Sequence, residues 1–271
     1  MSKRVILLKN QTKKLDKYQK VFEDENFEPI FVPLITHTNI PGEILNLLHD
    51  YNYLNSLQCL IVTSQRTVEC LVEEILPALD DISRNILINK VVYTVGPTTA
   101  NFLKAIGFTN ILGGFDAGNG DNLADIMITD LLDNDNTVVK DPKDINEILF
   151  LVGEIRRDII PKKLHKRNLK VREVVVYKTE DKVDSLVHFN ELYQDGDWVV
   201  VFSPQGTKPI LNYIKGNDSS CVNYRLVSIG PTTEKYLNDI GMPPVVTSKK
   251  PEANSLLDAI KNSQVNNNNI I

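Results

Sequence analysis

Val95-Gly96-Pro97-Thr98-Thr99 and Ile229-Gly230-Pro231-Thr232-Thr233 are two copies of one pattern, 134 residues apart (230 − 96). Each copy predicts a strand, a Gly-Pro turn, a short amphipathic helix and a glycine stop. The match continues past the turn, with the residues Phe102, Leu103, Ile106 and Gly107 returning as Tyr236, Leu237, Ile240 and Gly241. A repeat of this length is typical of a duplicated domain, because solenoid periods are shorter. We expect two similar domains that face a shared cleft.

Short apolar runs alternate with helical patterns on both sides of these segments. Parallel strands that are buried on both faces read as such runs, and their alternation with helices predicts an α/β fold. Two of the helices are expected at about 13–26 and around Ile159 to Leu164. The predicted strands are 5–8, 29–34, 60–62 and 91–95 in the first half and 148–152, 171–178, 198–202 and 226–229 in the second.

Composition narrows the class of protein. The 271 residues carry a net charge of −5, which disfavours general binding to nucleic acid or to a membrane surface. Cys59, Cys70 and Cys221 are scattered without metal or redox spacing, a usage typical of a reducing compartment.

The first apolar run is too short for a signal peptide or a membrane span, and we expect a cytoplasmic protein. The polar stretch after Asn262 predicts disorder, with 266–271 as an Asn-rich tail.

Hydroxyls, glycines and arginines gather where the predicted strands end. In parallel sheets, ligands bind at the carboxyl ends of strands, and the free N–H groups of helix starts favour carboxylates or phosphates there. Ordinary helix capping explains single Ser and Thr residues equally well. The candidate binding residues are Thr63, Ser64, Arg66, Gly96, Thr98, Thr99, Gly153, Arg156, Arg157, Ser203, Gly206, Gly230, Thr232 and Thr233.

Other chemistry finds little support in the chain. Its four histidines show no metal-ligand spacing, and no cysteine or GxSxG serine is placed as a nucleophile. The glycine-rich stretch 113–121 lacks a phosphate-loop pattern and is interpreted as a loop before a helix that Asp121 could cap. We therefore expect neither a metal nor a cofactor. Tyr177 follows three valines, where its hydroxyl could reach the interdomain cleft or its ring could serve packing alone.

Taken in order and spacing, the junctions resemble those of the uroporphyrinogen-III synthase family over residues 4–261. The segments that carry the resemblance are Thr63-Ser64-Gln65-Arg66-Thr67-Val68-Glu69, Val95-Gly96-Pro97-Thr98-Thr99-Ala100, Gly153 with Arg157-Asp158-Ile159-Ile160-Pro161, Val176-Tyr177-Lys178-Thr179, Phe202-Ser203-Pro204-Gln205-Gly206 and Ile229-Gly230-Pro231-Thr232-Thr233.

The resemblance implies two flavodoxin-like parallel-sheet domains from an internal duplication, joined by a two-stranded β connector. One domain would hold 1–34 plus 180–265, and the other 36–176. The connector strands would run over 29–36 and 171–179. The chain would begin in one domain, build the second and then return, so that domain and repeat boundaries differ.

The resemblance also implies a lyase that cyclises hydroxymethylbilane to uroporphyrinogen III, with loss of water and inversion of ring D. Tyr177 would assist departure of the hydroxyl, and Thr232 and Thr233 would take part in the reaction. The other junction residues would line the cleft. A monomer is expected, with transient hand-over of substrate from hydroxymethylbilane synthase. Glu154 departs from the family pattern, in which we expect a neutral residue after Gly153. A carboxylate there would repel an anionic substrate unless it points away or Arg156 neutralises it.

Two rival hypotheses stay open. A two-lobed binding or sensor protein for an anionic small molecule would also have duplicated α/β lobes and few catalytic residues. A nucleotide-sugar transferase is disfavoured by the small size and the missing phosphate loop.

Overall fold

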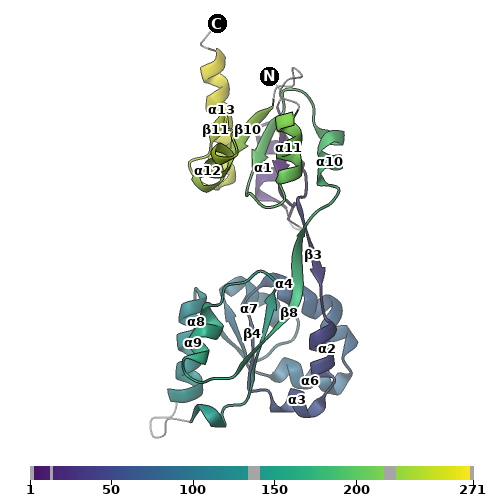
Figure 1. The fold of residues 1–271 in the computed structure, drawn as a ribbon, viewed down its shortest axis with the longest axis vertical. Coiled ribbons are helices and arrows are strands. Elements are labelled where there is room, and N and C mark those ends of the chain that lie inside the picture. Colours follow the sequence, from purple (N-terminus) through teal and green to yellow (C-terminus); the bar gives the residue numbers. More distant parts are fainter. Residues whose placement is uncertain (1–2, 13–14, 134–140, 217–223, 269–271) are drawn as a thin grey trace. The chain divides into compact units, whose positions relative to one another are not determined.

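A computed structural model describes residues 3–12, 15–133, 141–216 and 224–268 (Figure 1). Contacts between Cα atoms divide the chain into two compact units. Unit 1 comprises Met1–Thr36 and Glu180–Ile271, and unit 2 comprises His37–Thr179. Among the described residues, every helix is too short or too polar to span a bilayer.

Unit 1 is built on a five-stranded parallel sheet with the spatial order β11-β10-β9-β1-β2. Helices connect its strands. In chain order the elements are β1 (Arg4–Leu8), α1 (Lys17–Asp24), β2 (Glu28–Phe31), α10 (Ser185–Leu192), β9 (Trp198–Val201), α11 (Lys208–Gly216), β10 (Arg225–Ser228), α12 (Pro231–Asp239), β11 (Val246–Thr247) and α13 (Ala253–Asn268).

Unit 2 is built on a six-stranded sheet with the order β3-β8-β7-β4-β5-β6. Its elements are β3 (Ile35–Asn39), α2 (Gly42–Leu48), α3 (Tyr51–Ser56), β4 (Cys59–Val62), α4 (Gln65–Cys70), a π-helical turn (Leu71–Ile75), α5 (Leu76–Ala78), α6 (Asp81–Asn89), β5 (Val92–Val95), α7 (Pro97–Ala105), β6 (Ile111–Gly114), α8 (Gly120–Ile128), a second π turn (Thr129–Asp133), a 3-10 turn (Pro142–Asp144), β7 (Ile148–Gly153), α9 (Ile159–His165) and β8 (Val171–Asp181).

The two sheets share one spatial plan, which confirms the predicted α/β class with parallel sheets. Numbered along the chain, unit 1 has the order 2-1-3-4-5, the order of the flavodoxin-like fold. Unit 2 shows the same order when the count starts at β7 and continues through β8, β4, β5 and β6. Strand β3 is added at the edge of that sheet. The unit 2 copy is therefore a circular permutation of the unit 1 copy.

Apolar cores cover both faces of each sheet. In β4, Leu60 and Val62 face a core formed with α2 to α7, whereas Cys59 and Ile61 face a core formed with α8 and α9. Unit 1 repeats this arrangement, since Val199 and Val201 face α10 to α12 while Trp198 and Val200 face α1 and α13. This double burial explains why the strands read as continuous apolar runs.

Helix α1 begins later than the sequence predicts because of its cap. Asp16 is 1% exposed, accepts a hydrogen bond from the Tyr18 amide (2.9 Å) and pairs with the Lys9 ammonium (2.5 Å). A side chain that binds the first-turn amides fixes the helix start, so α1 opens at Lys17 instead of about 13.

The connector strand predicted at 29–36 is wrong in its bounds. Residues Glu28–Phe31 pair with β1 in the sheet of unit 1, and a separate strand, Ile35–Asn39, lies beside β8 in the sheet of unit 2. Pro33 lies between them and has no N–H for a ladder, which separates the two pairings. Strands β3 and β8 each cross the boundary between the units, at 36/37 and 179/180.

The predicted disorder after Asn262, which included the tail from 266, is also wrong as far as Asn268, where α13 ends. Leu256, Leu257 and Ile260 anchor this helix in the core, and extending an existing helix costs far less than nucleating one. Some predictions fall outside the described residues. These are the end of the tail (269–271), Cys221 and most of the polar stretch 133–143 between the two sequence repeats.

Candidate functional site

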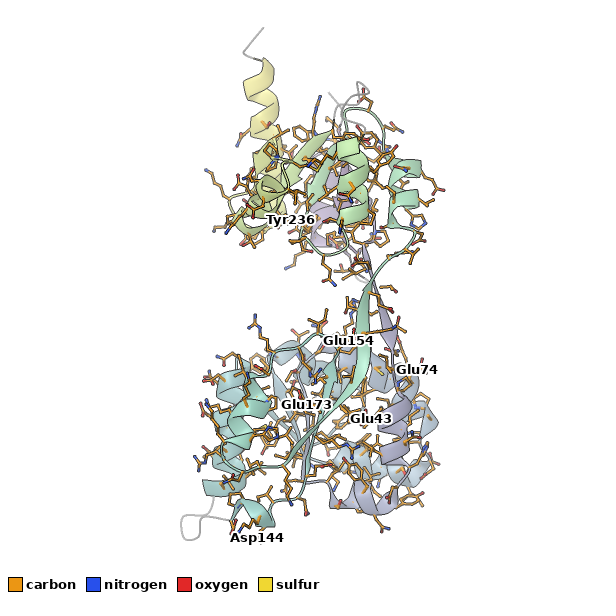
Figure 2. All side chains as sticks on the ribbon, viewed as in Figure 1. Glu43, Glu74, Asp144, Glu154, Glu173 and Tyr236 are labelled. Atoms are coloured by element: carbon orange, nitrogen blue, oxygen red, sulfur yellow. The ribbon has the colours of Figure 1, made fainter. Side chains whose placement is uncertain are left out.

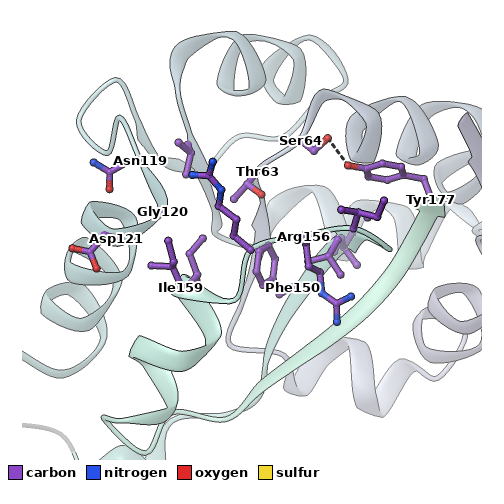
Figure 3. A pocket seen from close by; sticks show the side chains of 16 residues that line it. Thr63, Ser64, Asn119, Gly120, Asp121, Phe150, Arg156, Ile159 and Tyr177 are labelled. Atoms are coloured by element: carbon purple, nitrogen blue, oxygen red, sulfur yellow. Dashed lines mark hydrogen bonds between the residues drawn. The ribbon is translucent and has the colours of Figure 1, made fainter. Parts of the chain in front are cut away.

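A cavity of about 440 Å³ opens at the carboxyl ends of β4 and β7 in unit 2 (Figure 3). Six candidate residues from the sequence line it: Thr63, Ser64, Gly153, Arg156, Arg157 and Tyr177. The rest of the wall is formed by Val95, Asn119, Gly120, Asp121, Phe150, Leu151, Val152, Ile155, Ile159 and Ile160. The cavity thus combines an apolar floor with a few polar and cationic groups, which suits a ligand with apolar rings and carboxylates.

Ser64 links a helix start to the cavity. It caps α4, and its Oγ accepts a hydrogen bond from the Arg66 amide at 3.1 Å. The same Oγ is hydrogen-bonded to the Tyr177 hydroxyl at 3.1 Å, the dashed line in Figure 3. Besides the lone pair taken by the amide, Ser64 Oγ has a second lone pair and a proton, so either hydroxyl of this pair can donate.

A β-bulge brings Tyr177 to this place. Val152 pairs with Val175, but Gly153 pairs with Tyr177, so that Val176 is the extra residue on β8. Val176 and Tyr177 both pack against the core beside α4, although strict alternation would send neighbours to opposite faces. Bulges re-aim side chains in this way. Tyr177 therefore lies within β8, which continues to Asp181, three residues beyond the predicted strand 171–178.

Gly153 makes room for the tyrosine ring. A Cβ at Gly153 would lie 2.5 Å from Cζ of Tyr177 and 2.7 Å from its hydroxyl oxygen. Real Cβ atoms do not approach so closely, so the ring rests directly on the glycine backbone. Gly153, predicted as a binding residue, is buried and has this packing role in the structure.

The two arginines of the cavity differ in their partners. Arg156 forms a bidentate pair with Glu173, with Nε at 2.9 Å from Oε1, and this contact raises the arginine pKa although part of the side chain is buried. Arg157 makes no hydrogen bond or ion pair within the described part of the chain. Asp121, the nearby acid, is paired with Lys163 at 2.9 Å. Arg157 thus supplies positive charge to the cavity.

Glu154 does not line the cavity. Its side chain is exposed at the same edge of unit 2 as the cavity, and Asp144 lies at the opposite edge (Figure 2). Arg156 reaches only the backbone oxygen of Glu154, at 3.2 Å, and directs its charge to Glu173.

The repeated threonine pairs adopt the same arrangement in both units. In α7 and α12 the second threonine is buried and the first is exposed. Thr233 donates a hydrogen bond to the Phe202 carbonyl oxygen at 3.2 Å, which ties the start of α12 to the end of β9. Thr98 and Thr232 are the exposed members, and their side chains are the ones accessible to a ligand.

The glycines that open these helices differ in backbone conformation. Gly96 has a φ of 80°, a left-handed value that favours glycine, whereas Gly230 has a φ of 174°, which any residue adopts. Gly96, Thr98 and Thr99 do not line the cavity of unit 2, although Val95 does.

Gly206 holds the loop after β9 against the chain that leaves β2. A Cβ there would lie 2.6 Å from the Leu34 oxygen, and its φ is 72°. Ser203 is exposed in the same loop. Thr207, buried next to it, donates to the Pro204 oxygen at 2.7 Å and lies 3.4 Å from the hydroxyl of Tyr236, which Figure 2 labels in unit 1.

Arg66 lies outside the cavity and pairs with Glu69 on the same helix. The cap predicted for Asp121 is wrong, because Asn119 caps α8 by accepting from the Asn122 amide at 2.9 Å. Sequence reasoning missed Asn119, Gly120, Ile155 and Ile159 as wall residues, because they lie in loops and helix starts without a repeated pattern. No group of three or more His, Cys, Asp or Glu side chains in the described ranges is placed to hold a metal ion.

Comparison with known proteins gives a consistent result. The sequence profile of a family described as uroporphyrinogen-III synthase HemD matches residues 16–258. The chain is 52% identical over 267 residues to uroporphyrinogen-III synthase of Saccharomyces cerevisiae, covering 95% of each chain. It is 33% identical to the enzyme of that name from Schizosaccharomyces pombe, covering 95% of this chain and 96% of the relative.

Solved structures agree on the fold. A uroporphyrinogen-III synthetase from Helicobacter pylori superposes with a TM-score of 0.59 at 20% identity, covering 96% of this chain and 99% of the other. A mutant uroporphyrinogen III synthase from Thermus thermophilus gives a TM-score of 0.50 at 13% identity, covering 97% and 99%.

Proposed function

The chain belongs to the uroporphyrinogen-III synthase family, and we propose that it cyclises hydroxymethylbilane to uroporphyrinogen III with loss of water and inversion of ring D. The family is a lyase family of tetrapyrrole (haem) synthesis. One observation carries the proposal for this chain: the Tyr177 hydroxyl, held by Ser64 against Gly153, lies in the wall of a cavity that also holds Arg157, an arginine without an ion-pair partner in the described ranges.

The proposed reaction asks for positioning more than for strong acid–base chemistry. The C–O bond of the terminal hydroxymethyl group breaks, its electron pair leaves with the oxygen, which takes up a proton and departs as water, and the pyrrole nitrogen stabilises the cation left on carbon. The substituted α-carbon of ring D attacks that cationic carbon. The older bond from ring D to its bridging carbon then breaks and re-forms at the free α-carbon, whose proton is lost, so that the ring is inverted and the proton taken up by the water is returned. Holding both ends of a flexible chain in the reactive geometry supplies much of such an acceleration.

Tyr177 is proposed to donate a hydrogen bond to the departing hydroxyl. When substrate binds, Ser64 donates its proton to the Tyr177 oxygen, which frees the phenol proton for the leaving group. Serine and tyrosine thus form a short relay whose first member is anchored to a helix start. A Tyr177→Phe variant is expected to lose turnover by roughly a hundred-fold, within the range of general acid assistance.

The substrate carboxylates are proposed to bind Arg157, and the hydroxyls of Thr63 in the cavity wall and of the exposed Thr98 would add hydrogen bonds. Charged hydrogen bonds to a carboxylate are the strong ones. Thr232 and Ser203 of unit 1 are proposed as further substrate-binding residues, while Thr233 and Gly206 keep their loops in place. The remaining proposed substrate-binding residues act through the backbone or through neighbouring residues. They are Arg66, Gly96, Thr99, Gly153 and Gly230.

The units are proposed to fold as two domains, 1–34 plus 180–265 and 36–176, within a monomer. The duplication supports this state because it already provides two similar units. The proposed partner is hydroxymethylbilane synthase, which would hand over its product transiently. A cytoplasmic location is supported by the free, buried thiols of Cys59 and Cys70. An elution volume that stays constant on dilution is expected for the monomer, and a shift on dilution would contradict it.

An isomer assay tests the function. Fresh hydroxymethylbilane is supplied, the products are oxidised, and type I and type III uroporphyrin are separated by chromatography. Type III in excess of a no-protein control is expected. Type I at the control rate would refute the proposal and would favour the binding-protein hypothesis.

A further inference from the structure

His37 lies beside the proposed catalytic tyrosine. Its ring centroid is 6.4 Å from that of Tyr177, with the two planes at 76°, an edge-to-face arrangement. His37 Nδ1 is hydrogen-bonded to the Thr179 hydroxyl at 2.9 Å, and this bond fixes the plane of the imidazole. The tyrosine ring is thus confined by Gly153 and by His37, with its hydroxyl held by Ser64.

The charged groups around His37 come from two elements. Arg66 and Glu69 on α4 pair with each other and are near enough for their charges to act on the imidazole, and Glu73 in the π turn accepts from Asn39 at 3.1 Å. On β8, Tyr177 and Thr179 face it, while Lys178 and Glu180 alternate to the other face. The pKa of His37 is lowered from its ordinary value, mainly by burial and next by the positive charge of Arg66. The negative charge of Glu69 raises it by a smaller amount.

We propose that His37 is a positioning residue for Tyr177 and that its neutral form supports faster turnover than its protonated form. The inference rests on the proposed function, since it acts through Tyr177. A protonated imidazole would place a full positive charge against the ring of Tyr177, the residue proposed to meet the departing hydroxyl, and so on the side of the cavity where a cation would form on the substrate. It would also compete with Arg66 for Glu69 and so disturb the edge contact that holds the phenol.

Two opposing effects of protonation can be weighed. An imidazolium strengthens Tyr177 as a hydrogen-bond donor, which favours departure of the hydroxyl. The phenol, however, shares only a proton with the leaving group, whereas the substrate develops close to a unit charge, and two like charges repel through the low-dielectric wall. Repulsion is the larger effect, and turnover is expected to fall about ten-fold when His37 is protonated.

The experiment measures kcat, KM and the ratio of type III to type I product from pH 5 to 8. Wild type should lose kcat in acid with an apparent pKa below 6.5, the ordinary histidine value. His37→Phe keeps an aromatic edge and cannot titrate, so its kcat should stay flat over this range. His37→Ala should lose kcat about ten-fold at all pH values with KM little changed and with more type I product. His188→Phe, at a half-exposed histidine of α10, should match wild type.

A second measurement separates this inference from the function. With ¹³C-labelled tyrosine, the Tyr177 resonance, assigned with Tyr177→Phe, should shift with the same pKa as the His37 imidazole. An acid limb that persists in His37→Phe, or a His37→Ala variant with wild-type kcat and isomer ratio, would overturn the inference. If wild type makes no type III at any pH, the proposed function fails, and the shared NMR titration alone then decides whether His37 fixes Tyr177.

Discussion

Replacing Gly153 with alanine would disturb Tyr177 without touching its chemistry. Gly153 does not have a left-handed φ, so alanine meets no backbone penalty there. The added Cβ would lie 2.5 Å from Cζ of the tyrosine and 2.8 Å from Cε2. Carbon atoms pack at about 3.5–4.0 Å, so the ring must retreat by about 1 Å or more.

That displacement sets the expected magnitude. The Ser64–Tyr177 bond of 3.1 Å would lengthen to about 4 Å, beyond hydrogen-bonding range. Misplacing a reacting group by about 1 Å costs on the order of a hundred-fold in rate. Overpacking of the ring should cost about 1–3 kcal/mol of stability. The variant should therefore stay folded while kcat falls about a hundred-fold.

The assay is kcat for type III formation in a double-mutant cycle with Tyr177→Phe. If Gly153→Ala acts through the phenol, it should cost little more when Tyr177→Phe is already present, so the two losses should not add. Gly42→Ala is the matched control, because a Cβ there meets nothing within 4 Å. Wild-type kcat in Gly153→Ala, or fully additive losses, would refute the reasoning.

Three further outcomes are expected. Removal of the Arg157 side chain (Arg157→Ala) should raise KM about ten- to a hundred-fold, the value of one charged hydrogen bond of about 1.5–3 kcal/mol; an unchanged KM in steady-state kinetics would contradict its role. Leu103 and Leu237, equivalent core residues of the two copies, are both fully buried. Changing either leucine to alanine should lower the free energy of unfolding of its own unit by about 2–5 kcal/mol. Calorimetry should then show a lower Tm for that unit alone, and a lower Tm for both units would contradict two domains. Burial opposes ionisation of Asp16, but bonds from Lys9 and two backbone amides prevail and hold its pKa below 3.8. The stabilisation that Asp16 contributes should therefore be complete above about pH 5 and be lost as pH falls through that lowered pKa; in urea titrations Asp16→Asn should flatten this fall, and an unchanged pH slope would argue against it.

Much of the fold follows from local patterns. The Gly-Pro-Thr-Thr copies predict strand, turn and helix, and α7 and α12 begin at Pro97 and Pro231 as expected. Doubly buried strands are easily recognised because every residue is apolar, as in Ile148–Val152. The connector was harder to place, because Pro29 and Pro33 resemble margins of one strand, while pairing with β1 and with β8 divides the segment into two.

The candidate site was predicted in its residues and not in its geometry. Ser64, Gly153 and Tyr177 were each singled out from the sequence, yet their mutual contact depends on the bulge at Val176, which has no sequence signature. The pairing of Arg156 with Glu173 likewise depends on a strand and a loop that meet only in the fold. The roles of the individual site residues stay predictions until the variants are measured.

The permuted order of the sheets has a consequence for synthesis on the ribosome. Unit 2 is continuous in sequence and can complete all its pairings as soon as Thr179 has emerged. Strand β1, by contrast, needs β9 as a central neighbour, and Arg4 and Asp197 are 193 residues apart. At roughly 5–20 residues per second, an apolar strand of the nascent chain waits about 10–40 s for its partner. Chaperone dependence during translation should therefore concentrate on the first thirty or so residues.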